Sequence, residues 1–227
     1  LNGPGRLVEG PDPLIDLFVG DLEHGIEGSG IRAGMIKVVS EAEGITPDVN
    51  RVFRAAALAH RRSGAPITTH SHSPSRGGIA QQDLLSELGV PLERVVIGHA
   101  GDATDGKYLR EMADRGSWLG FDRFGMSHTQ SDGVRIRTLL DLLEAGYGDR
   151  LLLSHDAAVF SRITPPSWRA AHAPHWRMDT LHRMILPRLR AAGVDDATIT
   201  LLMRDNPRRL LTGGARGSFS GEVPADG

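Results

Sequence analysis

The amino-acid sequence predicts an α/β fold in which a parallel sheet forms part of a (β/α)8 barrel. Five short apolar strands alternate with amphipathic helices, and polar side chains stand at or near the end of every strand. Strands that are apolar along their whole length are expected to be buried on both faces, as in parallel sheets. Polar residues at all the strand ends favour a barrel over an open sheet, because every strand end of a barrel faces one mouth.

Each predicted strand is a run of apolar or β-branched residues that closes on a polar side chain. The five strands are expected at Met35–Val39, Ala65–His70, Val95–His99, Trp118–Asp122 and Leu151–Asp156. A closed barrel has eight strands and about 250 residues. The chain of 227 residues therefore shows about three strands fewer than a closed barrel needs.

Glycines mark the ends of the predicted helices. A helix over Val49–Arg62 has Pro47 in its first turn and Gly64 as its C-terminal cap. Later helices are expected to end at Gly89, Gly116, Gly146 and Gly193.

The two ends of the chain are expected to lie outside the regular pattern. Pro187 is expected to kink the helix over Asp179–Ala192, and Asn206-Pro207 is expected to end the last helix, which starts near Ala197. Leu1–Pro13 is predicted to be a loop. Residues 1–211 are assigned to one partial barrel domain, and residues 212–227, rich in Gly, Ser and Pro, to a flexible C-terminal tail.

The composition limits the chemistry that the chain can perform. Charged residues make up 24% and the net charge is −2, so neither nucleic acid nor a membrane is an expected partner. Cysteine is absent, which excludes disulfides, thiolate metal sites and cysteine nucleophiles. There is no Walker loop and no Gly-x-Ser-x-Gly elbow, so nucleotide-driven and serine-dependent chemistry have little support. No apolar run is long enough to span a membrane and no signal peptide opens the chain, so a cytoplasmic location is expected.

Two histidines stand at the ends of apolar strands. His70 and His99, together with Asp156 on another strand end, predict a metal site, because imidazole nitrogen and carboxylate oxygen suit zinc, cobalt, iron or manganese. The run His70-Ser71-His72 leaves two interpretations open. The two rings share one face of a strand and clamp a metal, or His72 already belongs to the following loop.

Lys37 lies inside an apolar strand. Its side chain either extends past the sheet to water or is desolvated, with a lowered pKa. A neutral lysine amine can act as a nucleophile, form a Schiff base or add carbon dioxide. The carbamate formed by the last reaction would be a carboxylate-like bridge between two cations.

Three other polar residues are candidates for catalysis or substrate binding. Asp156 can bind a metal and accept a proton from water, and Asp102, three residues after His99, can relay that proton. Arg123 offers a cation where negative charge develops, or it forms an ion pair with Asp122 or another neighbour.

The chain resembles the phosphotriesterase family of the amidohydrolase superfamily, and within it the phosphotriesterase-like lactonases. Six stretches carry the resemblance in family order and cover nearly the whole chain up to the tail: Gly30–Lys37, Gly64–His72, Val95–His99, Phe121–Gly125, Leu153–Asp156 and Asp205–Leu210. The resemblance implies a metal-dependent hydrolase on a TIM barrel with two divalent cations, zinc before cobalt, iron or manganese. It also implies a homodimer.

The resemblance assigns a role to each candidate. Lys37 would be carboxylated and bridge the two cations, His70 and His99 would bind one of them, and Asp156 would bind the other and act as the base. A hydroxide bridging the pair would be the nucleophile.

The remaining candidates follow the family in the same way. The Phe121–Gly125 loop resembles its lactonase form, with Arg123 lining the substrate site. Asp102 matches a position tied to proton relay in the phosphotriesterases, and His72 would lie just past the metal ligand.

One departure from the family is large. Its first strand carries a His-x-His pair that completes the second cation site, and no such strand precedes Lys37. The chain is therefore expected to carry only strands 4–8 of the barrel, with open edges prone to aggregation or to pairing with another chain. We interpret it as a piece of a longer active enzyme.

The expected function is hydrolysis of small-molecule lactones, with N-acyl-homoserine lactones as candidates, and promiscuous hydrolysis of phosphotriesters. Trp168 and Trp176, within Ala157–Trp176, are expected to line the substrate pocket. Two alternatives stay open: an inactive or partner-dependent half-barrel that binds metal without turnover, and an aldolase in which Lys37 forms a Schiff base.

Overall fold

The computed structural model describes residues 12–159, 161–162 and 164–213 and contains one parallel sheet. Its strands pair in the order of the sequence and are Ile36–Val39 (β1), Ile67–His70 (β2), Val95–Ile97 (β3), Trp118–Phe121 (β4) and Leu151–Leu153 (β5). All four pairings are parallel. This arrangement confirms the predicted α/β class and matches that of consecutive strands in a (β/α)8 barrel. Within the described residues, β1 pairs only with β2 and β5 only with β4.

Helices follow the strands as predicted. The α-helices are Pro13–Glu23 (α1), Pro47–Ser63 (α2), Gly77–Glu87 (α3), Gly106–Asp114 (α4), Asp132–Glu144 (α5), Pro166–His172 (α6), Leu186–Ala191 (α7), Asp196–Thr200 (α8) and Asn206–Thr212 (α9). Short 3₁₀ turns lie at Ile26–Gly28, Ser73–Ser75, Leu92–Arg94, Ala100–Asp102 and Gly148–Arg150. Two π-helical turns, Leu181–Ile185 (η6) and Leu201–Asp205 (η7), precede α7 and α9.

The helix α2 shows why these sequences form helices. The hydroxyl of Thr46 accepts a hydrogen bond from the amide of Val49 at 3.3 Å, and Pro47 occupies the first turn. Gly64 ends the helix with φ of 70°, a conformation that glycine adopts without steric cost. The predicted cap is therefore confirmed.

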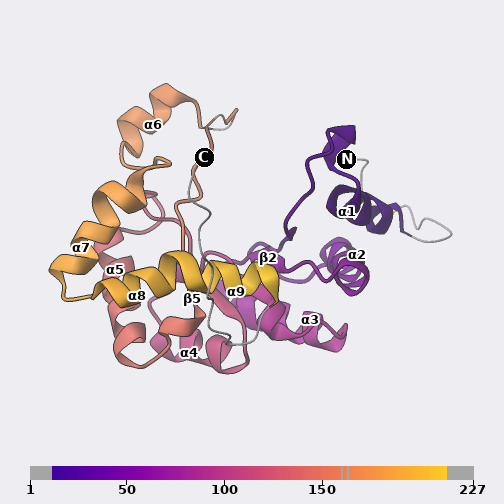
Figure 1. Cartoon of the computed structure of the whole chain (residues 1–227), viewed down its shortest axis with the longest axis horizontal. Coiled ribbons are helices and arrows are strands. Elements are labelled where there is room, and N and C mark those ends of the chain that lie inside the picture. The colour runs from indigo at the N-terminus through magenta and orange to yellow at the C-terminus, as the bar shows by residue number, and fades with distance from the viewer. Residues whose placement is uncertain (1–11, 160, 163, 214–227) are drawn as a thin grey trace, which may run out of the picture.

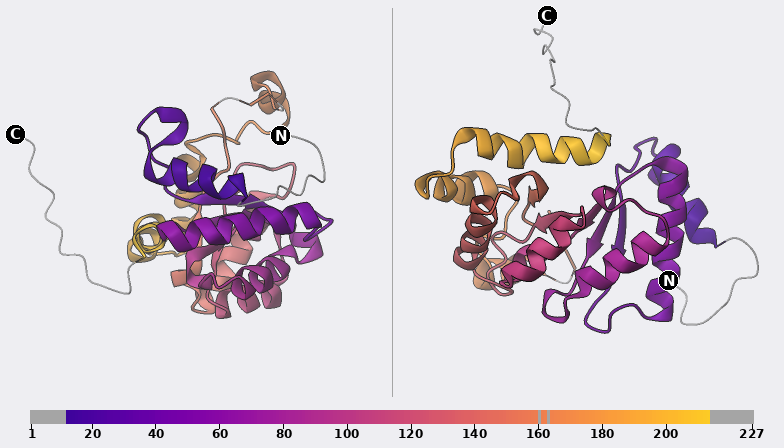
Figure 2. Two further views of the ribbon diagram at one scale, coloured as in Figure 1. Left: turned by 90° about the vertical axis from the view of Figure 1, so that its right-hand side faces the viewer. Right: turned by 90° about the horizontal axis from the view of Figure 1, so that it is seen from below.

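The outer helices pack on one face of the sheet. Consecutive helices from α1 to α4 contact one another, as does the pair α4 and α5, and Figures 1 and 2 show them following the sheet from its indigo to its orange end. The main core lies between these helices and the strands, where Ile36, Ile97 and Leu119 pack with Phe53 and Leu109. A smaller cluster covers the opposite face, where α9 brings Leu210 against Val96 and Trp118.

The prediction that every strand is buried on both faces is wrong for β1. All residues of β3 and β4 are buried, but β1 alternates between buried and exposed residues. Ile36 and Val38 face α2, whereas Lys37 and Val39 are exposed. The reason is that the described part of the chain covers only one face of this strand.

The predicted break at Asn206-Pro207 is also wrong. The helix continues through η7 into α9, because the wider π-turn precedes Pro207 and accommodates a ring that would clash with the carbonyl four residues back in a regular α-helix. A π-turn also precedes Pro187, where η6 leads into α7, and the predicted kink at this proline stays a prediction.

Two helices were missed by the sequence analysis. The predicted loop over Leu1–Pro13 lies outside the described residues up to residue 11, and no helix was predicted directly after it, yet Asp12 caps α1 by accepting a hydrogen bond from the amide of Leu14 at 3.0 Å. The Asp-Pro pair that precedes an apolar run was the available signal. The second helix, α6, lies inside the expected pocket loop. The predicted tail lies outside the described residues from residue 214 onward.

Asn206 is expected to be important for stability. Its buried side-chain amide donates to the carbonyls of Gly148 and Leu151, both at 2.8 Å, and so joins α9 to the start of β5. Asn206→Ala should lower the free energy of unfolding by about 1–3 kcal/mol, because both carbonyls lose this donor. Urea denaturation measures the change. Thr212→Ala, which removes an exposed hydroxyl from the same helix, should cost under about 0.5 kcal/mol. Equal losses in the two variants would contradict the prediction.

Candidate functional site

The predicted site residues gather at the carboxyl ends of the strands. Lys37 lies in β1, His70 is the last residue of β2, and His99 and Asp156 follow β3 and β5 within three residues. The electrostatic environment of Lys37 includes Asp156, and that of His70 includes both His99 and Lys37. Strand pairing sets Lys37 and His70 on the same face of the sheet, because Lys37 is level with Thr68, two residues before His70.

The two histidines contact each other directly. His70 Nδ1 lies 2.9 Å from His99 Nε2, and the rings meet edge to face. The outer nitrogens face carboxylates: His70 Nε2 lies 3.2 Å from Glu41, and His99 Nδ1 lies 2.9 Å from Asp122. Asp122 also accepts the backbone N–H of His99 at 3.0 Å. The resulting line runs carboxylate, imidazole, imidazole, carboxylate.

When both rings are neutral, the line of four groups has two N–H protons for its three contacts. Each neutral imidazole has a single N–H, and the outer carboxylates of Glu41 and Asp122 attract both of these protons. In the tautomers that place both protons on the outer nitrogens, the inner nitrogens of His70 and His99 face each other as lone pairs, and in the other tautomers one ring donates a hydrogen bond to the other. Burial and the neighbouring His99 lower the pKa of His70, which disfavours filling the gap with a third proton. With the protons on the outer nitrogens, the two inner lone pairs are available to a cation.

The amine of Lys37 donates a hydrogen bond to the carbonyl of Thr69 at 2.9 Å. Desolvation by the surrounding protein lowers the pKa of Lys37, and the carboxylates of Asp122 and Asp156 oppose that change. The residue is nevertheless exposed to water, which screens these interactions. A lowered pKa increases the fraction of neutral amine, the form that adds carbon dioxide.

Arg123 links the two candidate catalytic carboxylates. Its Nη1 lies 2.9 Å from Asp102, and its Nε lies 3.4 Å from Asp156. Of the two interpretations left open, the ion pair is therefore observed, but with Asp102 and Asp156. Asp122 bonds to His99 instead.

Two candidates have unusual backbone conformations. His99 has φ of 61° and Asp156 has φ of 50°, in the left-handed region that residues other than glycine seldom adopt. Such conformations persist where the surrounding structure holds them and occur often at functional sites. They turn both side chains immediately after their strands end.

The remaining sequence candidates separate into two groups. His72 belongs to the connection after β2, where its Nδ1 lies 3.0 Å from Ser75 Oγ, so it is not paired with His70. Trp176 lies near the mouth and donates its indole N–H to the carbonyl of His155 at 2.9 Å. Trp168 belongs to α6, where its ring meets that of His128 edge to face and stacks on that of His172.

The sequence analysis missed Arg135. This residue of α5 is fully buried and bonds to Asp102 with its Nε at 3.0 Å and its Nη2 at 2.6 Å. The available signal was its spacing, because Arg135 shares a helical stripe with Leu139 and Leu142, both of which are buried. A charged residue on such a stripe needs a buried partner.

The donor chemistry of this edge fits a divalent cation. No group of three or more His, Cys, Asp or Glu residues arranged to hold a metal is present within residues 12–159, 161–162 and 164–213. The histidine pair supplies two nitrogens, and His99 is held by Asp122 as metal-binding histidines usually are. Asp156, and Lys37 after carboxylation, would add oxygen donors. Such a nitrogen and oxygen set suits zinc, cobalt, iron or manganese.

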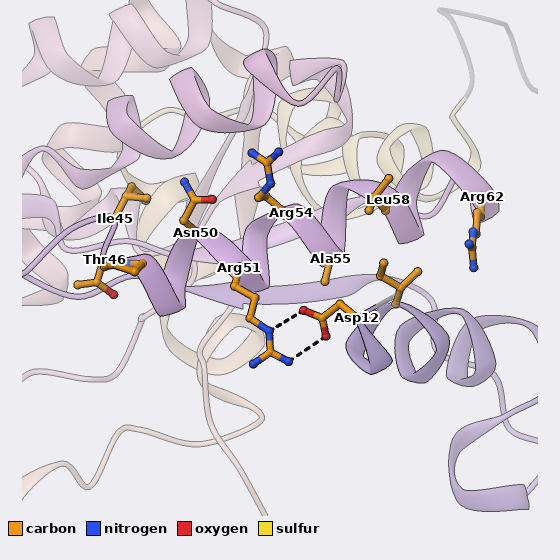
Figure 3. Close-up of a pocket in the computed structure, with 11 residues that line it drawn as sticks. Asp12, Ile45, Thr46, Asn50, Arg51, Arg54, Ala55, Leu58 and Arg62 are labelled. Carbon is orange, nitrogen blue, oxygen red and sulfur yellow. Dashed lines mark hydrogen bonds and ion pairs between the residues drawn. The ribbon is translucent and has the colours of Figure 1, made fainter. Parts of the chain in front are cut away.

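A cavity of about 890 Å³ lies elsewhere, along α2 and the start of α1 (Figure 3). Two of its arginines have acidic partners: Arg51 bonds to Asp12 at 2.6 Å, and Arg62 lies 3.6 Å from Asp16. None of its lining residues is a strand-end candidate. Its size therefore does not make it the candidate active site.

Comparison with known proteins identifies the family. The model of the phosphotriesterase family matches residues 3–211. The chain belongs to the phosphotriesterase family. This membership confirms the resemblance seen in the sequence. It is also consistent with a TIM-barrel-type arrangement of the parallel sheet.

Solved structures and curated relatives are similar to the chain over most of its length. The structure of the phosphotriesterase from Mycobacterium tuberculosis is 42% identical, has a TM-score of 0.88, and aligns with 92% of this chain and 64% of its own. A mutant of a lactonase from Deinococcus radiodurans is 36% identical, with a TM-score of 0.78 over 87% of this chain and 63% of its own. An aryldialkylphosphatase of Saccharolobus solfataricus is 34% identical over 88% of this chain and 65% of its own.

Each of these matches covers only part of the relative's length. The chain spans 64–65% of the length of three curated relatives that it matches. In the part of the chain that the structure describes, no helix combines the length and apolar character needed to cross a membrane.

Proposed function

We propose that the chain carries the hydrolytic centre of a cation-dependent lactonase, with N-acyl-homoserine lactones as candidate substrates and slower hydrolysis of phosphotriesters. The observation that carries the proposal is the pair of inner nitrogens of His70 and His99, held between Glu41 and Asp122. The family adds support, because its members include a lactonase of D. radiodurans and an aryldialkylphosphatase of S. solfataricus.

The residues divide into ligands and groups that act on the substrate. His70, His99 and Asp156 would hold divalent cations, with Lys37 as a carboxylated bridge, and zinc is the first candidate. When bound, the cations would polarise the carbonyl or phosphoryl oxygen and acidify water. Asp156 accepts the proton of the attacking water.

Arg123 binds the substrate beside this base. Its guanidinium lies within 3.4 Å of Asp156, where it can face the oxygen that gains negative charge. A lactone and a phosphotriester both place their electrophilic atom at the same point, so one set of groups serves both reactions. Asp102, predicted as a proton relay, contacts Arg123. The homodimer and the cytoplasmic location stay predictions.

The two lysines of the sequence allow a matched test of the carbamate. Lys37→Ala should abolish a carbamate carbon signal that the chain acquires in ¹³C-bicarbonate, whereas Lys107→Ala on α4 should retain it. Lactone hydrolysis by the metal-loaded chain should fall at least about tenfold in Lys37→Ala, and a chelator should remove it in the parent. Unchanged turnover in Lys37→Ala would contradict the bridging role.

Other outcomes of the same experiment favour the two alternatives. Metal uptake without turnover by the parent chain would indicate a metal-binding half-barrel. Borohydride trapping of a carbonyl substrate on Lys37, detected as a mass increase, would indicate Schiff-base chemistry and contradict a carbamate at that residue. A carbamate signal on Lys37 together with chelator-sensitive turnover would support the proposed cation-dependent hydrolase.

A further inference from the structure

Arg135 is the largest fully buried side chain in the described part of the chain. A guanidinium that leaves water loses its hydration and must have every N–H bonded to be tolerated. Arg135 meets this demand with oxygen atoms alone. Its nearest acceptors are Asp102 Oδ1 at 2.6 and 3.0 Å, the carbonyl of Gln130 at 2.6 Å and the hydroxyl of Thr129 at 2.7 Å.

These acceptors belong to two different parts of the site. Asp102 follows β3 and His99, whereas Thr129 and Gln130 lie in the loop after β4 that carries Arg123. Longer contacts at 3.4 Å reach the carbonyl of Met126 in the same loop. The guanidinium of Arg135 therefore binds both the ion-pair partner of Arg123 and the backbone of its loop.

Asp102 is shared between two arginines. Its Oδ1 accepts from Arg135, and its Oδ2 accepts from Arg123 at 2.9 Å. From Arg123 the line continues to Asp156 at 3.4 Å. Exposure increases along this line, from 0% for the side chain of Arg135 to 14% for Asp102, 18% for Arg123 and 44% for Asp156. Arg135, the buried end of this line, is also the residue with the most hydrogen bonds to the surrounding protein.

We propose that Arg135 is a positioning residue that holds the guanidinium of Arg123 beside Asp156, acting through Asp102 and through the loop after β4. The inference rests on the proposed function, in which Arg123 binds the substrate. Because both oxygens of Asp102 are occupied by guanidinium groups, this carboxylate serves to orient Arg123. Loss of Arg135 would free Asp102 and the loop together.

The first test measures the position of Arg123 without turnover. In the chain labelled with ¹⁵N-arginine, the side-chain Nε–H of Arg123 is assigned by its loss in Arg123→Lys, and its exchange with solvent is followed by NMR. Arg135→Met should speed that exchange at least about tenfold, because the ion pair loses its anchor.

The matched control removes packing from the same helix. Leu139→Ala opens a cavity one turn after Arg135 in α5 without touching Asp102, so exchange at Arg123 should change less than about twofold. Arg135→Lys keeps the charge but not the forked geometry of the guanidinium. Its exchange rate at Arg123 should lie between those of the parent and Arg135→Met. Arg135→Lys also replaces Arg135→Met if the latter does not fold. Equal exchange in the parent and the Arg135 variants, or equal acceleration in Leu139→Ala, would overturn the proposal.

The second test asks whether Arg135 acts through Arg123. Arg135→Met should lower kcat/KM for a lactone by about 10- to 100-fold in the parent chain, since small misplacements of a binding group cost that much. In the Arg123→Met background the same substitution should cost less than about threefold. Losses that multiply in the double variant would contradict the proposal. If the parent has no turnover, the proposed function fails, and the exchange measurement still decides the role of Arg135.

Discussion

Replacement of Gly98 by alanine is expected to destabilise the chain by about 3 kcal/mol or more. A Cβ at this position would stand well inside contact distance of the Thr69 carbonyl oxygen and 3.3 Å from Asp122 Oδ2. Backbone oxygen cannot move aside as a flexible side chain can, so β2 and β3 would have to separate. The same oxygen accepts the hydrogen bond from Lys37, so the site would be disturbed as well. Thermal and urea denaturation would measure the loss.

Gly20→Ala is the matched control for this prediction. Gly20 lies within α1, and a Cβ there would meet no atom within 4 Å. Alanine should stabilise the helix by about 0.5–1 kcal/mol, because glycine loses more conformational freedom on folding. The same chemical change thus has opposite signs at the two positions. A Gly98→Ala variant as stable as the parent would show that the strands approach less closely than described.

Asp156→Asn should lower kcat for lactone hydrolysis by about 10²–10⁴-fold. The amide keeps the shape of the side chain but cannot accept the proton of the attacking water, and it binds a cation more weakly than a carboxylate does. Asparagine also tolerates the left-handed backbone of this residue, φ 50°, so the fold should be retained. Steady-state kinetics at saturating metal, with circular dichroism of both proteins, would measure these effects.

Asp196→Asn supplies the control, because it neutralises a carboxylate on α8 that pairs with Arg190. It should leave kcat within about twofold of the parent, because surface substitutions away from the candidate site generally have small effects. A wild-type rate in Asp156→Asn would remove this residue from the role of base. A loss restored by excess metal would assign it to metal binding alone.

Much of the fold followed from local patterns. The five strands, their parallel order and the helix between Pro47 and Gly64 are each predicted by apolar runs and capping residues that act over a few positions. The strand-end histidines were also recognisable, because a polar side chain that closes a buried strand requires a partner. Errors remain: the exposed face of β1 depends on what covers it, the helix continues past Pro207 through a π-turn, and the local capping signal of α1 at Asp12-Pro13 was overlooked.

The site divides in the same way. Residue types and order were enough to choose Lys37, His70, His99 and Asp156. The residue type determines which donor atoms a side chain offers, and parallel strands bring their carboxyl ends to one edge of the sheet. Which partner each group takes depends on distances between residues far apart in the chain.

Only the folded chain showed that Asp122 holds His99 rather than Arg123, and that Asp102 joins Arg123 to a buried arginine of α5. Hydrogen bonds and ion pairs act over about 3 Å, and no spacing in a linear sequence specifies which side chains come that close.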